Sequence, residues 1–214
     1  MFIVVWFMNQ NAQRLQFYVS LIRDIITGIS ALIVAIVAVI GLGTWKKQLK
    51  GKTEYEIAQK LLRAVYRVRR AINVIRNPFI GVSEIREAMN EANMVYDPGA
   101  HVNNALNHEL VFQKRWRGVL DAFVDMDAYG LEAETLWGQV VHERLQPLRQ
   151  SANELYRNIM MLLTHLNNQE LNNNSPEIRR IRELIYISPN DTFGRDFNDA
   201  VTQIEIFLKP KLNL

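Results

Sequence analysis

Residues 25–42 read IITGISALIVAIVAVIGL, eighteen consecutive residues without a charged side chain. Thr27 and Ser30 are the two residues of this stretch with polar side chains. As a helix the stretch would be about 27 Å long, close to the ~30 Å hydrocarbon layer of a bilayer. A helix also satisfies its backbone hydrogen bonds internally, which lipid requires. The stretch therefore predicts a transmembrane helix.

The residues that flank this stretch predict its orientation in the membrane. Trp45 follows the stretch, and Phe17 and Tyr18 precede it, as expected for aromatic residues at the two interfaces. Two arginines precede the stretch, whereas five lysines follow it: Lys46, Lys47, Lys50, Lys52 and Lys60. Because basic flanks favour the cytoplasmic side, we expect the amino terminus outside and the carboxyl-terminal part in the cytoplasm.

Two other interpretations compete with a membrane span. A core helix that is apolar on every face needs comparable apolar segments around it, and the chain has no second run of this kind. A signal peptide has a shorter apolar run and an earlier basic residue than Arg14. We therefore expect the span to remain in the mature chain. Its small residues Thr27, Ala31 and Ala35, spaced four apart, are a possible surface for self-association.

Charge is distributed unevenly along the 214 residues. Residues 46–76 contain ten Lys or Arg against two Glu, whereas residues 77–214 contain thirteen basic and nineteen acidic residues. We expect four lysines and one tryptophan to contact anionic lipid headgroups: Lys46, Lys47, Lys50, Lys52 and Trp45. Nucleic acid is not an expected partner, because the acidic distal part would repel it.

Apolar residues at helical spacing predict helices after the span, and no alternating pattern predicts a strand. The first helix continues to Asn77-Pro78, because proline disfavours helical geometry in the residue before it. The faces outside its apolar seam are expected to carry the basic residues Lys60, Arg63, Arg67, Arg69, Arg70 and Arg76. One apolar seam consists of Ala58, Leu61, Val65, Val68, Ile72 and Ile75.

Two helices are expected between residues 83 and 130. Ser83 is the expected N-cap of the first, which extends to about Val95 and ends at the turn 97–99. The second runs from about Asn103 to Asp127, and Gly130 breaks it. Its expected buried residues are Leu106, Leu110, Trp116, Val119, Leu120, Phe123 and Val124.

Three helices are expected after Gly130. The first begins near Leu131 and continues, with a bend at Pro147, to a polar loop at 167–176. A short helix covers 176–186, and Asp191 caps a last helix that stops at Pro210. Two further seams are Leu148, Ala152, Leu155, Ile159, Leu162 and Leu166 in the first helix, and Phe193, Phe197, Val201, Ile204 and Leu208 in the last.

These elements predict an all-α protein, with an N-terminal transmembrane helix followed by a cytoplasmic antiparallel helical bundle. The expected organisation has three parts. Residues 1–16 form a short tail, residues 17–45 hold the transmembrane helix and its flanks, and residues 46–214 form the cytoplasmic helical domain with a basic first helix.

Motifs for nucleotide or calcium binding are incomplete. Gly51-Lys52-Thr53 lacks the glycine that a phosphate-binding loop carries five positions earlier, and no strand precedes it. Asp125, Asp127 and Gly130 match three positions of a calcium loop, but position 12 is Leu136 and the bidentate carboxylate is missing. We therefore predict no cofactor.

Metal and acid–base catalysis also lack a complete set of residues. His108-Glu109 and His142-Glu143 begin like zinc-protease helices, but each lacks the second histidine. His101 and His165 have no evident catalytic partner, so surface or hydrogen-bonded core positions are expected for all four. Distances among the carboxylates Asp121, Glu132, Glu134 and Glu143 do not follow from the sequence. The chain has no cysteine, which excludes disulfides and thiolate metal sites. No enzymatic reaction is therefore predicted.

Residues 44–56, TWKKQLKGKTEYE, follow directly on the apolar stretch. They resemble the juxtamembrane stretch of a set of uncharacterised bacterial membrane-anchored proteins with a TWKxQLKGxxEYE-like motif. The similarity extends to 76–79 (RNPF), 131–138 (LEAETLWG) and 204–210 (IEIFLKP). The resemblance implies a single-pass protein of the bacterial inner membrane and supplies no activity or catalytic residues.

Two functions of different classes follow from these predictions. The first is a membrane-anchored interaction or scaffold protein, whose cytoplasmic bundle binds itself or a protein partner. The alternative is an oligomerising membrane effector or small channel that responds to a cytoplasmic signal, suggested by Thr27, Ala31 and Ala35 beside the apolar segment 1–8. A pore usually carries polar groups, and the span offers few.

Overall fold

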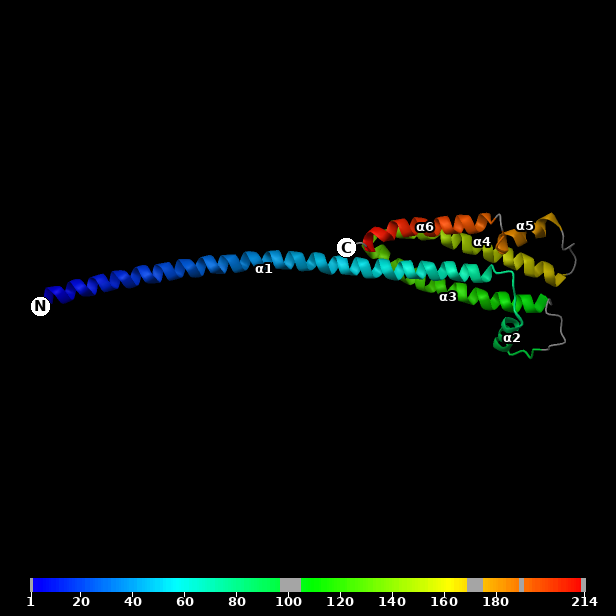
Figure 1. Cartoon of the computed structure of the whole chain (residues 1–214), viewed down its shortest axis with the longest axis horizontal. Helices are drawn as coiled ribbons and strands as arrows, with labels where there is room; N and C mark the ends of the chain where they lie inside the picture. Colours follow the sequence, from blue (N-terminus) through cyan, green and yellow to red (C-terminus); the bar gives the residue numbers. More distant parts are fainter. Residues whose placement is uncertain (1, 97–104, 169–174, 189–190, 213–214) are drawn as a thin grey trace. The chain divides into compact units, whose positions relative to one another are not determined.

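A computed structural model of the chain describes residues 2–96, 105–168, 175–188 and 191–212, with side chains from Tyr18 onward in these ranges except at 167–168. They contain six helices and no strand, which confirms the all-α prediction (Figure 1). The helices are α1 (Phe2–Ile75), α2 (Val82–Glu91), α3 (Ala105–Trp137), α4 (Val140–Asn168), α5 (Pro176–Ile185) and α6 (Thr192–Leu212). The chain divides into two compact units, Met1–Lys52 and Thr53–Leu214.

In the first unit, the described residues all belong to α1, from Phe2 to Lys52. The helix begins at Phe2, so the segment that we expected as a separate tail is helical and continuous with the apolar stretch. Its polar residues 9–14 include no glycine or proline that would interrupt a helix. The side chains of residues 25–42 are all exposed within the structure. By length and composition this is one helix that could cross a membrane.

The second unit has its own apolar core. The three predicted seams are confirmed: the residues of the α1 seam are at most 1% exposed, the α6 seam is buried throughout, and the α4 seam is buried except for the half-buried Leu166. All three seams belong to one cluster, to which α3 and α5 also contribute. Helix α4 packs against α3, α5 and α6, and α2 packs against α3.

Helix α3 is longer than its sequence predicts. Gly130 does not break it, and the helix continues to Trp137, where Gly138 adopts a positive φ of 74°. Helix α4 therefore begins at Val140 rather than near Leu131. A Cβ atom on Gly130 would lie 2.8 Å from Leu145 Cδ1. The glycine thus allows close approach between α3 and α4 instead of ending a helix.

The buried face of α3 also differs from the prediction. Val119 is buried as expected, and Leu110, Trp116 and Phe123 are half-buried. The prediction was wrong for Leu106, Leu120 and Val124, which are exposed. The buried stripe instead contains small, polar and charged residues among the apolar ones: Asn107, Val111, Phe112, Arg115, Val119, Ala122, Met126, Gly130 and Ala133. A stripe of this composition has no strong hydrophobic periodicity, which is why the sequence misplaced it.

Some helix ends lie where the sequence predicts them, and others do not. Asp191 Oδ1 accepts a hydrogen bond from Gly194 N at 2.8 Å, which confirms the predicted cap of α6. Ser83 is not an N-cap, because Gly81 holds that position and α2 begins at Val82. Helix α6 continues past Pro210 to Leu212, where the Lys211 ammonium lies 4.6 Å and 4.8 Å from the ring centres of Trp137 and Phe207. The predicted turn 97–99 and the start at 103 lie outside the described residues.

Candidate functional site: a membrane anchor and a charged groove

The apolar stretch of α1 presents hydrocarbon on all sides. Its two hydroxyl groups bond to the helix itself: Thr27 Oγ1 donates to the Arg23 carbonyl oxygen and Ser30 Oγ to the Ile26 carbonyl oxygen, both at 2.8 Å. Neither hydroxyl therefore needs water or a partner chain to satisfy its donor. Thr27, Ala31 and Ala35 are exposed and lie within about 80° of one another around the helix.

The residues predicted to meet lipid headgroups are all at the surface. Trp45 is exposed, and so are the four lysines, Lys46, Lys47, Lys50 and Lys52. At 3.6 residues per turn the first three lysines fall within about 100° of one another, and Lys52 points to another side. The lysines thus surround the helix after the apolar stretch, and their contact with anionic headgroups stays a prediction.

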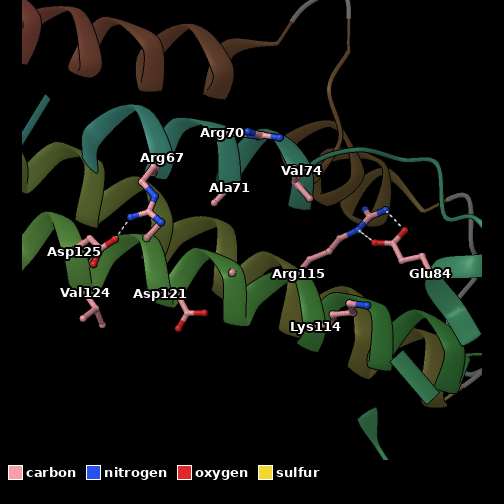
Figure 2. Close-up of a pocket in the computed structure, with 12 residues that line it drawn as sticks. Arg67, Arg70, Ala71, Val74, Glu84, Lys114, Arg115, Asp121, Val124 and Asp125 are labelled. Carbon is pink, nitrogen blue, oxygen red and sulfur yellow. Dashed lines mark hydrogen bonds and ion pairs between the residues drawn. The ribbon is translucent and has the colours of Figure 1, made fainter. Parts of the chain in front are cut away.

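The second unit contains a groove of about 680 Å³ between the last turns of α1 and the middle of α3, with α2 at one end (Figure 2). We call it the α1–α3 groove. Small residues line its centre, Ala71 from α1 and Gly118 and Ala122 from α3. The partly exposed Val74 and Val124 give it apolar edges.

Ion pairs close both ends of this groove. At one end Arg67 Nη1 pairs with Asp125 Oδ2, linking α1 to α3. At the other end Arg115 forms two hydrogen bonds of 2.7 Å with the carboxylate of Glu84, and it also donates to the Asn77 carbonyl oxygen at 2.7 Å. Arg115 is buried, so these partners compensate the loss of hydration of its charge.

Between these pairs the groove carries two charged side chains of opposite sign, Arg70 on α1 and Asp121 on α3. Both are exposed, and neither forms an ion pair or hydrogen bond within the part of the chain that the structure describes. In the sequence Arg70 belongs to a row of arginines with Arg63, Arg67 and Arg69, which suggests phosphate binding and gives no indication of a groove. Asp121 was considered only as a possible catalytic carboxylate, and no second carboxylate is paired with it here.

Arg76 corrects a prediction about the end of α1. We expected it on a face outside the apolar seam, but it is buried together with the seam and is 1% exposed. Its guanidinium donates to both carboxylate oxygens of Asp191 at 2.6 and 2.8 Å and to the Leu184 carbonyl oxygen at 3.1 Å. It also lies over the ring of Phe193, 4.6 Å from its centre. Arg76 therefore joins α1 to the α5–α6 connection.

Asp191 keeps its negative charge because of this arrangement. Burial alone would raise the pKa of the carboxyl group, but hydrogen bonds from Arg76 and from Gly194 N lower the pKa below its usual value. Nearly all donors of Arg76 are engaged by the protein, so this pair has a structural role and does not form a binding site.

The calcium and zinc patterns have no counterpart in the described ranges. Asp125 and Asp127 lie within α3 and pair with Arg67 and Arg149, and no cluster of three or more potential metal ligands occurs there. His142 is exposed and His165 buried, whereas His101 lies outside these ranges. The Nδ1 atoms of His108 and His165 have no hydrogen-bond partner among the described residues, unlike the expected core histidines. Burial lowers the pKa of His108.

No protein family, curated protein or solved structure matches this chain. The resemblance of residues 44–56 to bacterial membrane-anchored proteins therefore stays an expectation.

Proposed function

We propose that this protein is a membrane-anchored helical interaction protein. One transmembrane helix holds the second unit at the cytoplasmic face of a bacterial inner membrane, where the unit binds a second copy of the chain or another protein. The observation that carries the proposal is the contrast between residues 25–42, whose apolar side chains are all exposed, and the second unit, which buries its own seams. An apolar surface of this size is stable in lipid and not in water.

An antiparallel helical bundle is the arrangement of the second unit that its contacts support best. Along α3 and α4, the Trp116 ring lies 4.7 Å from that of Tyr156, and Asp127 pairs with Arg149 at 2.7 Å. Residue numbers thus rise along α3 while they fall along α4. The same holds for α1 and α3, where Arg67 pairs with Asp125 and Arg115 bonds to the Asn77 carbonyl oxygen. Short connections favour this topology.

The orientation of the span rests on the lysines that follow it. Each lysine near an anionic surface contributes about 1 kcal/mol of attraction, and the positive-inside bias favours a cytoplasmic location for this flank. Replacement of Lys46, Lys47, Lys50 and Lys52 by glutamine is expected to change orientation or to weaken association with anionic lipid. Protease protection in sealed vesicles reports orientation. Unchanged insertion, orientation and lipid association would disprove the electrostatic role.

The alternative of a small channel receives no support from the span. Pores need polar groups that face water, whereas the hydroxyls of Thr27 and Ser30 bond to the backbone of their own helix. We therefore expect the purified protein to give no ion flux across liposomes. Conductance above that of empty liposomes would favour the channel instead.

Extraction and mass measurement together test the proposal. The protein is expected to resist carbonate extraction of membranes and to dissolve in mild detergent as a dimer or as a complex with a copurifying partner. Release by carbonate would remove the anchor, and a strict monomer without partners would remove the interaction role.

A further inference from the structure

We propose that the α1–α3 groove is the contact surface between two copies of this chain, with Arg70 of each copy facing Asp121 of the other. The inference deepens the proposed function, on which it rests, because it names both the partner and the surface. The two copies would be related by a two-fold axis that runs along the groove.

The two unpartnered charges lie at the same level of the groove. The pair Arg67–Asp125 on one side and the bond from Arg115 to the Asn77 carbonyl oxygen on the other fix the antiparallel register of α1 and α3. Along the two helices both residues lie between these contacts, Arg70 on the α1 wall and Asp121 on the α3 wall, as Figure 2 shows. A two-fold axis along the groove exchanges the walls, so each Arg70 meets the Asp121 of the second copy.

Charge complementarity favours a second copy over other partners. A strongly acidic ligand such as nucleic acid would be attracted by Arg70 but repelled by Asp121, and a strongly basic ligand would meet the reverse. The charges of the groove that are paired within the chain leave one unpaired charge of each sign among the described residues, on opposite walls, and such a surface is complementary to itself under a two-fold rotation.

The centre of the groove is open enough for another backbone to approach. Gly118 lies in the middle of α3, where glycine destabilises a helix by about 1 kcal/mol relative to alanine. Apart from the adjoining backbone of α3, no heavy atom of the described residues would lie within 4 Å of a Cβ atom at this position, so packing within the chain does not require glycine. Val74 and Val124, 48% and 67% exposed, supply apolar surface beside it.

Charge reversal in separate chains tests the pairing directly. In Arg70→Glu homodimers two glutamates would face two aspartates, and in Asp121→Arg homodimers two arginines would face two arginines. A mixture of the two variants restores both attractive pairs between unlike chains. An attraction within one chain could not be restored in this way, because no single chain of the mixture carries both changes.

Energy transfer between labelled full-length chains in mild detergent measures the association. The chain has no cysteine, so Asn153→Cys, at an exposed position, accepts a single donor or acceptor label. All chains also carry Ala31→Leu and Ala35→Leu, which remove the small face of the span. We expect each charge variant to raise the dimer dissociation constant at least about tenfold and the mixture to return it to within about threefold of the parent.

Two further variants control for folding and for charge alone. Arg63→Glu makes the same charge change at an exposed position of α1 outside the groove and is expected to leave the dissociation constant unchanged. Gly118→Trp should fill the groove and abolish energy transfer, while helical circular dichroism and thermal unfolding, both measured below the dimer dissociation constant, stay those of the parent. Single variants that associate like the parent, or a mixture that is not restored, would overturn the proposal. Carbonate extraction of the same variants tests the anchor separately.

Discussion

Helix α1 contains two stretches of eighteen residues that share one backbone conformation but differ in how their apolar side chains are distributed around the helix. Residues 25–42 are apolar on every face, and all their side chains are exposed. Residues 58–75 have one apolar seam that is at most 1% exposed, with arginines on the remaining faces. The periodicity of hydrophobic residues, and not helix formation itself, thus separates a segment suited to lipid from one suited to a protein core.

The free energy of exposing apolar side chains to water shows that the two stretches need different surroundings. Leaving one large aliphatic side chain in water costs about 1.5–3 kcal/mol, so the eleven Ile, Val and Leu residues of the first stretch would cost more than a whole domain's stability of about 5–15 kcal/mol. The second stretch covers its seam with α3, α4 and α6 within one core. An Asp introduced into each stretch should therefore have different consequences.

The largest effect is expected for Val65→Asp in the seam. Val65 is fully buried, so an unpaired carboxylate there should destabilise the second unit by more than about 4 kcal/mol. Thermal unfolding followed by circular dichroism measures the loss, and carbonate extraction should still find the chain in the membrane. Arg63→Asp, two residues earlier on the exposed face, is the matched control and should change stability by less than about 0.5 kcal/mol. A stable Val65→Asp protein would contradict the core.

The ion pair next to each stretch provides the second test. Arg76 and Asp191 have side chains 1% and 17% exposed, whereas Arg23 and Asp24 are 76% and 69% exposed. Asp191→Asn leaves the buried Arg76 without its counter-charge and should cost about 3–5 kcal/mol in free energy of unfolding. Asp24→Asn should cost nothing measurable, because an exposed pair contributes less than about 1 kcal/mol. Equal effects would contradict the different roles of the two pairs.

Acid should weaken the same buried pair. Since the folded-state pKa of Asp191 is lowered, its stabilising effect is complete above the usual carboxyl pKa and is lost as the pH falls through the lowered value. The difference in unfolding free energy between the wild type and Asp191→Asn should therefore shrink below about pH 4. Denaturant titrations at pH 7 and at successively lower pH measure it. A difference independent of pH would show that the carboxylate charge is not what stabilises the pair.

A somewhat smaller effect is expected for Val34→Asp, the counterpart of Val65→Asp in the apolar stretch. A carboxylate near the bilayer centre costs about 2.5–3.5 kcal/mol on insertion scales. We expect a larger carbonate-extractable fraction but unchanged thermal unfolding of the second unit, because Val34 is exposed and belongs to the other unit. Val34→Ala is the control and should remain inserted. A Val34→Asp chain that stays in the membrane like Val34→Ala would contradict the span.

The sequence predicted the parts of the fold that depend on local periodicity. The seams of α1, α4 and α6 consist of large apolar residues at regular spacing, and the Asp191 cap depends on the next three residues. The prediction from sequence failed where contacts between residues far apart in the chain determine which side chains are buried. Arg115 and Arg76 are buried because distant carboxylates and carbonyl oxygens meet them. The groove could not be predicted, because only the register of α1 and α3 places Arg70 and Asp121 along the same groove.

Two glycines of α3 give the smallest and most specific test of how a helix surface is used. Gly118 is exposed and a Cβ atom there has no near neighbour, so Gly118→Ala should stabilise the monomer by up to about 1 kcal/mol through helix propensity. Gly130 is buried, and a Cβ atom there would lie 2.8 Å from Leu145 Cδ1. Gly130→Ala should therefore cost about 1 kcal/mol net, since displacement of Leu145 outweighs the same gain in propensity.

Denaturant unfolding at concentrations below the dimer dissociation constant compares these two variants with the parent. Opposite signs are expected, and the double variant Gly130→Ala with Leu145→Ala should lose the clash although it gains a cavity. If both glycine variants were equally stabilising, α3 and α4 would not need the close approach at Gly130, and the sequence-based expectation of a helix break there would have failed for another reason. The sign at Gly130 therefore decides whether packing against α4 or local propensity explains why α3 continues to Trp137.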